Sequence, residues 1–200
     1  MSLVEAKPEI NVVWPVTMRS AAMVCEYAGR TCYRSIDKIG PGTAEPFLRA
    51  RIKDGHTSVL GHASVTVEVV CSRSCSHQIV RHRLASYAQQ SQRYVKQRPW
   101  LYVDPWTEVR PHGHAGWMHT VEAAFKQYDW MLRSGQKPED ARSVLPSCAA
   151  TRLVWTQNLA QWRHVLRLRT DKRAQAEFRG LMLDLLAWFR VEAPWLVFDL

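Results

Sequence analysis

Residues 63–71 carry the pattern that most narrows the folds open to this chain. Val65, Val67 and Val69 alternate with more polar residues over this stretch, which is rich in β-branched side chains. Successive side chains of a strand point to opposite faces, so the alternation predicts a half-buried β-strand. Residues 9–16 alternate more weakly and are expected to form another strand. We therefore expect a small, mostly antiparallel sheet early in the chain.

Helices are expected around these strands. Ser20 is a candidate N-cap for a helix over residues 21–32, and the turn-rich residues 37–42 follow it. Residues 44–53 predict a short helix that stops at Gly55. Residues 72–80 are expected to be helical and to lead into an arginine-rich segment.

The second half of the chain predicts mainly helix. Residues 114–133 form one candidate, ended by Ser134 and Gly135, and Pro138 begins another with acidic residues in its first turn. Two apolar stripes at helical spacing follow, and we interpret both as core positions: Trp155, Leu159, Trp162 and Leu166, and then Phe178, Met182, Leu185 and Phe189. No repeat or linker divides the chain, so we expect a single α+β domain over residues 1–200, with the sheet early and helices late.

Composition narrows the class of protein. The chain is 46% hydrophobic and 22% charged, as in ordinary globular proteins. No apolar run is long enough to cross a bilayer, and the first residues lack the apolar core of a signal peptide. Five cysteines, an odd number without an export signal, argue against a disulfide framework. We therefore expect a cytoplasmic protein that does not associate with membranes.

The formal net charge of +9 predicts an affinity for polyanions. Nucleic acid, an anionic membrane face and phosphorylated small molecules all qualify, and nine tryptophans add stacking surface. The charge alone does not choose among these partners, so the position of the arginines matters more.

Residues 81–94, called the basic segment below, hold the densest group of candidate binding side chains. They contain three arginines, one histidine, two serines and three glutamines. Arginine forks donate paired hydrogen bonds to phosphate, serine hydroxyls complete an anion site, and glutamines can recognise a base or a ribose. These residue types together predict a site for a nucleotide ligand with more than one phosphate group. On residue types alone, a solvated basic face or a nucleic-acid patch with interleaved aromatics stays open.

The order of the residues favours the nucleotide site. Arg81-His82-Arg83, seven residues and then Ser91 resemble the R-H-R-x7-S signature of flavin-dependent thymidylate synthases. Residues 56–62 resemble the family's H-x-T-x-x-E-H block, and residues 141–146 resemble its A-R-x-x-L-P block. Residues 156–158, 162–164, 168–169 and 173–177 resemble the C-terminal helical region. These blocks follow the family's order from about residue 20 to the end of the chain.

Some positions depart from the family pattern. Gly61 stands where glutamate is usual, Ala88 where asparagine is usual, and Gln89 where glutamate is frequent; Gln92 replaces a common glycine. These differences keep open a related enzyme that transfers another one-carbon group, such as hydroxymethyl, to a pyrimidine nucleotide. A basic nucleic-acid-binding module is the alternative from another class.

The resemblance implies a homotetramer whose active sites lie between subunits. It implies FAD-dependent methylation of dUMP to dTMP, with methylenetetrahydrofolate as carbon donor and NADPH as reductant, and no role for nucleic acid. The residues that would contact FAD are Ser58, Arg81, His82, Arg83, Leu84, Gln89, Asn158, His164 and Arg173. Those that would hold dUMP are Gln78, Arg81, Gln89, Gln90, Ser91, Gln92, Arg93, Arg142 and Arg169. Arg169 would be catalytic, since a fixed guanidinium beside the pyrimidine stabilises charge developing there.

Other chemistry-bearing residues have simpler interpretations. We interpret Ser91 as a phosphate ligand and not a nucleophile, because its neighbours are cationic and no Ser-His-carboxylate order surrounds it. Cys148 is expected to be a core residue at a helix start. The set Cys71, Cys75 and His77 lacks a second ligand pair, so no metal site is expected. His56 and His62 stay open between loop residues and a role near flavin or folate.

Overall fold

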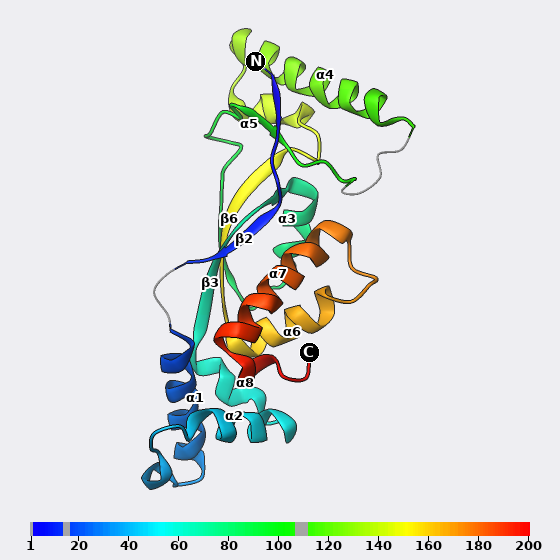
Figure 1. Ribbon diagram of the computed structural model, residues 1–200. Coiled ribbons are helices and arrows are strands. Elements are labelled where there is room, and N and C mark those ends of the chain that lie inside the picture. The colour runs from blue at the N-terminus through cyan, green and yellow to red at the C-terminus, as the bar shows by residue number, and fades with distance from the viewer. Residues whose placement is uncertain (1, 14–16, 107–111) are drawn as a thin grey trace. The chain divides into compact units, whose positions relative to one another are not determined.

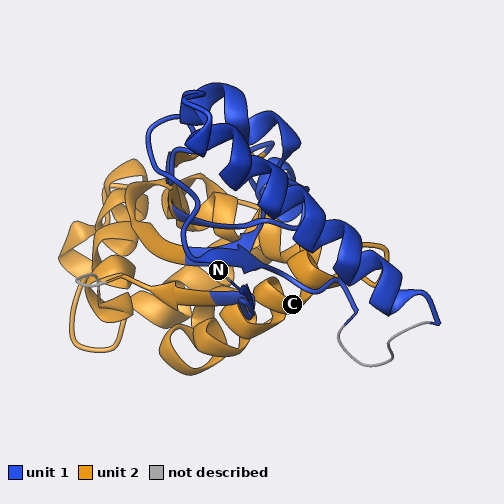
Figure 2. Cartoon of the chain, turned by 90° about the horizontal axis from the view of Figure 1, so that it is seen from above, with its two compact units in different colours: residues 1–9, 69–81, 88–153 blue, residues 10–68, 82–87, 154–200 orange. Residues whose placement is uncertain are grey.

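The computed structural model describes residues 2–13, 17–106 and 112–200 (Figure 1). The chain divides into two compact units, which are coloured separately in Figure 2. Unit 1 comprises residues 1–9, 69–81 and 88–153, and unit 2 comprises residues 10–68, 82–87 and 154–200. Both units are built from stretches that are distant in the sequence. The single domain over residues 1–200 stays a prediction.

The strands confirm the α+β class. Four of them form one sheet in the order β2 (Glu9–Val12), β3 (Ser64–Ser72), β6 (Ala150–Asn158) and β4 (Ser86–Gln89). A parallel pair joins β1 (Leu3–Glu5) to β5 (Trp100–Tyr102). The strand expected at residues 63–71 is confirmed as β3, and its alternating valines are buried. The strand expected at residues 9–16 is confirmed as far as Val12, and residues 14–16 lie outside the described residues.

Unit 2 is mainly helical. Its helices are α1 (Met18–Cys32), α2 (Ala44–Lys53), α6 (Leu159–Arg169), α7 (Ala176–Glu192) and α8 (Pro194–Val197), with 3-10 turns η1 (Ile36–Lys38) and η2 (Thr57–His62). The helix expected at residues 44–53 is confirmed, and Gly55 follows it with φ of 78°. Ser20 as N-cap is wrong. Thr17 caps α1, because its hydroxyl accepts a hydrogen bond from the Ser20 amide at 3.2 Å.

Large aromatic side chains form the core of unit 2. Helix α6 packs against α7 and η2, and α8 packs against α2, α6 and α7 (Figure 1). The rings of Trp155 and Trp162 lie 4.5 Å apart, and the Trp162 indole donates to the carbonyl of Val65 at 3.0 Å. The stripe from Phe178 to Phe189 is confirmed on α7, where its members are buried.

The first expected stripe is wrong at its first member, because Trp155 lies in strand β6 and not in a helix. Leu153, Trp155 and Gln157 are buried at alternate positions of that strand. Asn158 then ends the strand and caps α6, with its side-chain oxygen accepting from the Gln161 amide at 2.9 Å. The helix therefore starts at Leu159, and the second half of the chain also contributes a strand to the sheet.

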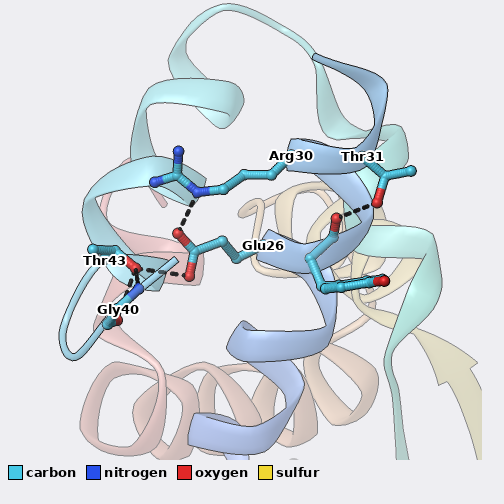
Figure 3. A network of polar contacts seen from close by, with 6 residues as sticks. Glu26, Arg30, Thr31, Gly40 and Thr43 are labelled. Atoms are coloured by element: carbon cyan, nitrogen blue, oxygen red, sulfur yellow. Dashed lines mark hydrogen bonds and ion pairs between the residues drawn. The ribbon is translucent and has the colours of Figure 1, made fainter. Parts of the chain in front are cut away.

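A buried acid fixes one loop of unit 2 to helix α1. Glu26 is only 1% exposed, and its carboxylate accepts from Arg30 Nε at 2.7 Å and from the Thr43 hydroxyl at 3.0 Å (Figure 3). The Gly40 amide donates to the same hydroxyl at 3.0 Å. Because a buried carboxylate must be paired and hydrogen-bonded, this network holds the loop before α2 in place.

Unit 1 contains α3 (Arg73–Ile79), α4 (His114–Arg133), α5 (Pro138–Ala141) and η3 (Arg142–Val144). The helices expected at residues 72–80 and 114–133 are confirmed, with Ser72 as the N-cap of α3 and Gly135 at φ of 89° just beyond α4. A core cluster joins β5 to α4: Trp100, Tyr102, Val121, Phe125 and Ala149. In the described ranges no helix is both long and apolar enough to cross a bilayer.

The position expected for Cys148 is wrong, although its packing against the core is confirmed. It lies in the turn before β6 and not at a helix start, half-buried against the core cluster of unit 1. Burial raises the pKa of its thiol to about 11. Near neutral pH the side chain is therefore a thiol and not a thiolate.

Candidate active site

In unit 2 a histidine of the basic segment meets the last turn of helix α6. Arg169 Nε donates a hydrogen bond to His82 Nε2 at 3.2 Å. The guanidinium carbon of Arg169 also lies 4.9 Å from the centroid of the Phe178 ring, at cation–π distance. Two contacts from different parts of the chain thus hold the end of this arginine.

The His82 ring is enclosed by other rings of unit 2. Its centroid lies 6.0 Å from that of Trp155, 6.0 Å from that of Phe178 and 6.4 Å from that of His164. The Tyr87 hydroxyl donates to the His82 carbonyl at 2.8 Å, which fixes the backbone there. The sequence had predicted Trp155 and Phe178 only as core residues, and nothing in their spacing indicated this second role.

The protonation state of His82 follows from these contacts. A guanidinium can only donate, so Nε2 accepts and the ring proton is carried on Nδ1. Burial, the charge of Arg169 and the neighbouring His164 lower the pKa of His82 to about 4. His82 is therefore a neutral hydrogen-bond acceptor near pH 7.

A cavity of about 550 Å³ lies beside this pair in unit 2. It is lined by the end of α6 and the loop after it: His164, Arg167, Leu168, Arg169, Asp171, Arg173 and Ala174. Asp171 accepts from Arg173 Nε at 3.0 Å, and this bond is the main cause that lowers the pKa of Asp171 to about 2. Three guanidinium groups against one carboxylate favour an anionic ligand.

The other unit 2 candidates lie apart from this pair or at its edge. Ser58 is exposed in η2, and Arg83 and Leu84 are exposed in the loop before β4. Asn158 caps α6 through its side chain. A Cβ placed on Gly61 would meet only the Asn158 amide nitrogen, at 3.9 Å, so a side chain fits at this position. His56 contacts the Tyr33 hydroxyl at 3.3 Å, and His62 ends η2 on the surface.

In unit 1 the later part of the basic segment approaches helix α5. Arg93 Nε donates to Glu139 Oε2 at 2.6 Å, and Arg142 Nε donates to the Glu139 carbonyl at 3.1 Å. The Arg93 amide donates to the Ser91 hydroxyl at 3.1 Å. Arg93 and Arg142 thus both contact Glu139, which the sequence indicates only as part of a helix start, and Ser91 contacts the backbone of Arg93.

The glutamines of unit 1 lie on and beside strand β4. Gln89 is half-buried and donates to the hydroxyls of Ser76 at 3.0 Å and Thr151 at 3.2 Å. The Gln90 amide donates to the carbonyl of Arg152 at 2.9 Å, so its backbone extends the strand pairing. Arg81 and Gln90 are exposed, while Gln78 and Gln92 are half-buried.

The boundary between the units falls inside the R-H-R motif, between Arg81 and His82. The predicted dUMP ligands, except Arg169, belong to unit 1, and most predicted FAD ligands belong to unit 2. Cys71 and Cys75 are buried free thiols and His77 is exposed. The residue roles and the expected absence of a metal stay predictions.

Comparison with known proteins identifies the family. A family model described as thymidylate synthase complementing protein matches residues 16–195. The flavin-dependent thymidylate synthase of Mycolicibacterium vanbaalenii is 37% identical, with 92% of this chain and 81% of that protein covered. The enzymes of that name from Mycobacterium tuberculosis and Mycolicibacterium gilvum are 36% identical with the same coverage.

This chain belongs to the flavin-dependent thymidylate synthases. The resemblance carried by the R-H-R-x7-S motif is therefore confirmed, and so is the expectation of a methyltransferase enzyme with a flavin cofactor.

The side chains of unit 2 fit a flavin nucleotide. Arg167 and Arg173 provide cations for a pyrophosphate along the cavity wall. The aromatic side chains Trp155 and Phe178 lie against His82 beside Arg169. The cations on the cavity wall match the phosphates of such a cofactor, whereas Trp155 and Phe178 are fully buried and contact His82 from the core.

Proposed function

We propose that this chain methylates dUMP to dTMP with FAD as its bound cofactor, methylenetetrahydrofolate as carbon donor and NADPH as reductant. The observation that carries the proposal is Arg169, held between His82 and Phe178 at a cavity lined by cations. FAD, when bound, supplies the redox chemistry of the reductive methylation. The residues of the chain bind, orient and stabilise charge.

The FAD ligands that we propose include the residues around this cavity. His164 and Arg173 lie on its wall, and His82 contacts Arg169, which also lines it. Further ligands come from the basic segment, from η2 and from the start of α6: Ser58, Arg81, Arg83, Leu84, Gln89 and Asn158. The cap that the Asn158 side chain forms on α6 fixes the position of this residue.

For dUMP we propose a phosphate site made by Ser91, Arg93 and Arg142. Arg93 pairs with the Glu139 carboxylate while Arg142 donates to the Glu139 carbonyl, and this supports the proposal, because a cation that attracts a carboxylate also suits a phosphate. Gln78, Arg81, Gln89, Gln90 and Gln92 complete the ligand set. Arg169 takes the catalytic role, donating to the pyrimidine as negative charge develops there while C5 becomes nucleophilic.

We also propose a homotetramer, with active sites shared between subunits, in the cytoplasm. Met23, Val24 and Tyr27 form an exposed apolar strip on α1, and an assembly would bury such a strip. All five cysteines are free thiols, as a reducing compartment favours. Light scattering on the purified protein measures the assembly directly.

The flavin spectrum of the purified protein tests whether the chain binds FAD, on which the whole proposal depends. We expect a yellow protein that releases FAD, and not FMN, on denaturation. With isotope-labelled dUMP, methylenetetrahydrofolate and NADPH, mass spectrometry should detect dTMP. A hydroxymethylated product would instead establish the related one-carbon transfer. A folded protein that neither carries nor takes up FAD, and binds nucleic acid with steep salt dependence, would refute the enzyme proposal.

A further inference from the structure

The contact between His82 and Arg169 joins residues that are 87 positions apart in the sequence. Arg169 ends helix α6, and His82 lies in the loop before β4. Both side chains are partly buried, and no ion pair is involved. The fold, and not the local sequence, brings these two side chains together.

A long arginine side chain has many rotamers, and ordering it costs conformational entropy. Here Nε is fixed by the imidazole, and the guanidinium carbon lies 4.9 Å from the centroid of the Phe178 ring. In the described part of the chain, His82 is the one hydrogen-bond partner shown for this guanidinium. The two terminal nitrogens can therefore donate together to a ligand in the cavity that Arg169 lines.

A neutral acceptor suits this task better than a carboxylate. An aspartate or glutamate at the same place would offset the charge of the guanidinium and weaken its pull on an electron-rich ligand. The rings that enclose His82 keep it uncharged, as its lowered pKa indicates. A protonated imidazole would repel the arginine and could not accept its hydrogen bond.

We propose that His82 is a positioning residue for Arg169, accepting the Nε hydrogen bond so that the terminal nitrogens of the guanidinium face the pyrimidine with undiminished charge. The inference rests on the proposed role of Arg169 in dTMP formation. It adds a second function for His82 beside the flavin contact proposed above.

A double-mutant cycle measures the coupling between the two residues. Turnover at saturating dUMP, per bound FAD, is compared for the wild type, His82→Ala, Arg169→Ala and the double variant. We expect His82→Ala to lower turnover about tenfold, the effect of one hydrogen bond to a charged group. In the Arg169→Ala background the same change should have almost no further effect. His82→Gln, which keeps an acceptor, should recover part of the loss.

Additive losses in this cycle would overturn the proposal, since they would mean that His82 acts through the flavin alone. Arg190→Ala is the matched control. It removes an exposed arginine from the last turn of α7, where its terminal nitrogen donates to the Leu200 carbonyl at 3.0 Å, outside the cavity. We expect its turnover to equal that of the wild type.

The tautomer of His82 gives a readout that is independent of activity. In holoenzyme with ¹⁵N-labelled histidine, the signal lost in His82→Gln assigns the ring. We expect Nδ1 to carry the proton in the wild type and the Nε2-protonated form to appear in Arg169→Ala. Protonation at Nε2 in the wild type would refute the inference. If the tautomer is as expected but the wild type makes no dTMP, the proposed function fails and the inferred hydrogen bond stands.

Discussion

Replacing Arg169 by alanine separates catalysis from stability. The change removes a hydrogen bond to neutral His82 and a cation–π contact with Phe178. Each contributes on the order of 1 kcal/mol, so unfolding should become easier by roughly 2 kcal/mol, out of the 5–15 kcal/mol typical of a domain. The variant should therefore remain folded.

The expected effect on the reaction is larger. A fixed donor at a developing negative charge contributes about 3–4 kcal/mol to the transition state, so dTMP formation at saturating dUMP should fall on the order of a hundredfold or more. FAD content, assembly and NADPH oxidation should stay close to those of the wild type. These four quantities are measured on the same purified sample.

Arg167 provides a demanding comparison because it lines the same cavity on the same helix end. Its side chain is 66% exposed and pairs with Asp199 at 3.1 Å. Exposed pairs of this kind contribute about 0–1 kcal/mol. We expect Arg167→Ala to lose far less turnover than Arg169→Ala. Equal, small losses in both variants would show that Arg169 is only a helix-end cation, and the catalytic assignment would be wrong.

Three further changes test other parts of the structure. Ser91→Ala should raise the Kd for dUMP several-fold yet leave turnover at saturation, measured by titration and initial rates; lost turnover with normal binding would indicate covalent chemistry. Glu26→Ala leaves the half-buried Arg30 without its carboxylate partner and should lower the free energy of unfolding in urea by roughly 3 kcal/mol, whereas a loss below about 1 kcal/mol would contradict the network around Glu26. Hydrogen bonds from Arg163 are the main cause that lowers the pKa of Asp199 in the folded protein. The stability from this pair is therefore present above the unfolded-state pKa of about 3.9 and is lost as the pH falls through the lower folded-state value, so Asp199→Asn should weaken the pH dependence of Tm in that range. An unchanged profile would contradict the assignment.

The helices that the sequence predicted well have a strong local signal where they end. Residues 44–53 and 114–133 combine an apolar period with a glycine just beyond the last turn, and the structure places Gly55 and Gly135 at positive φ. Local physics is enough in these cases, since a glycine adopts the left-handed conformation without a steric penalty.

The sequence did not predict strand β6, because its local pattern fits two different structures. Trp155 happens to stand four residues before Leu159, so it fits a helical stripe as well as a strand. Only its neighbours in the sheet decide between the two, because alternate positions of β6 are buried by distant parts of the chain. Thr156, for example, meets the hydroxyl of Thr66 at 2.9 Å. Tertiary contacts override the local pattern in such cases.

In the candidate site too, residue types can be read from the sequence, but contacts between distant residues cannot. The sequence predicts which side chains of the basic segment could bind anions, since that depends on residue type, and this assignment stays a prediction. It could not predict that Arg93 pairs with Glu139 or that His82 meets Arg169, because 46 and 87 residues separate these partners. Glu139 and Phe178 could be found only once the fold had brought them to the arginines.

The partners of the arginines explain why one cation among many can be catalytic. A net charge of +9 says that the chain attracts anions, but not where an unopposed charge lies. Around the unit 2 cavity, Arg173 pairs with Asp171 and Arg167 shares Asp199 with Arg163, so a carboxylate offsets the first charge and partly offsets the second. Arg169 instead donates to a neutral imidazole and lies over an aromatic ring. Its orientation is fixed without loss of charge, and such a preorganised donor stabilises a developing anion at little reorganisation cost.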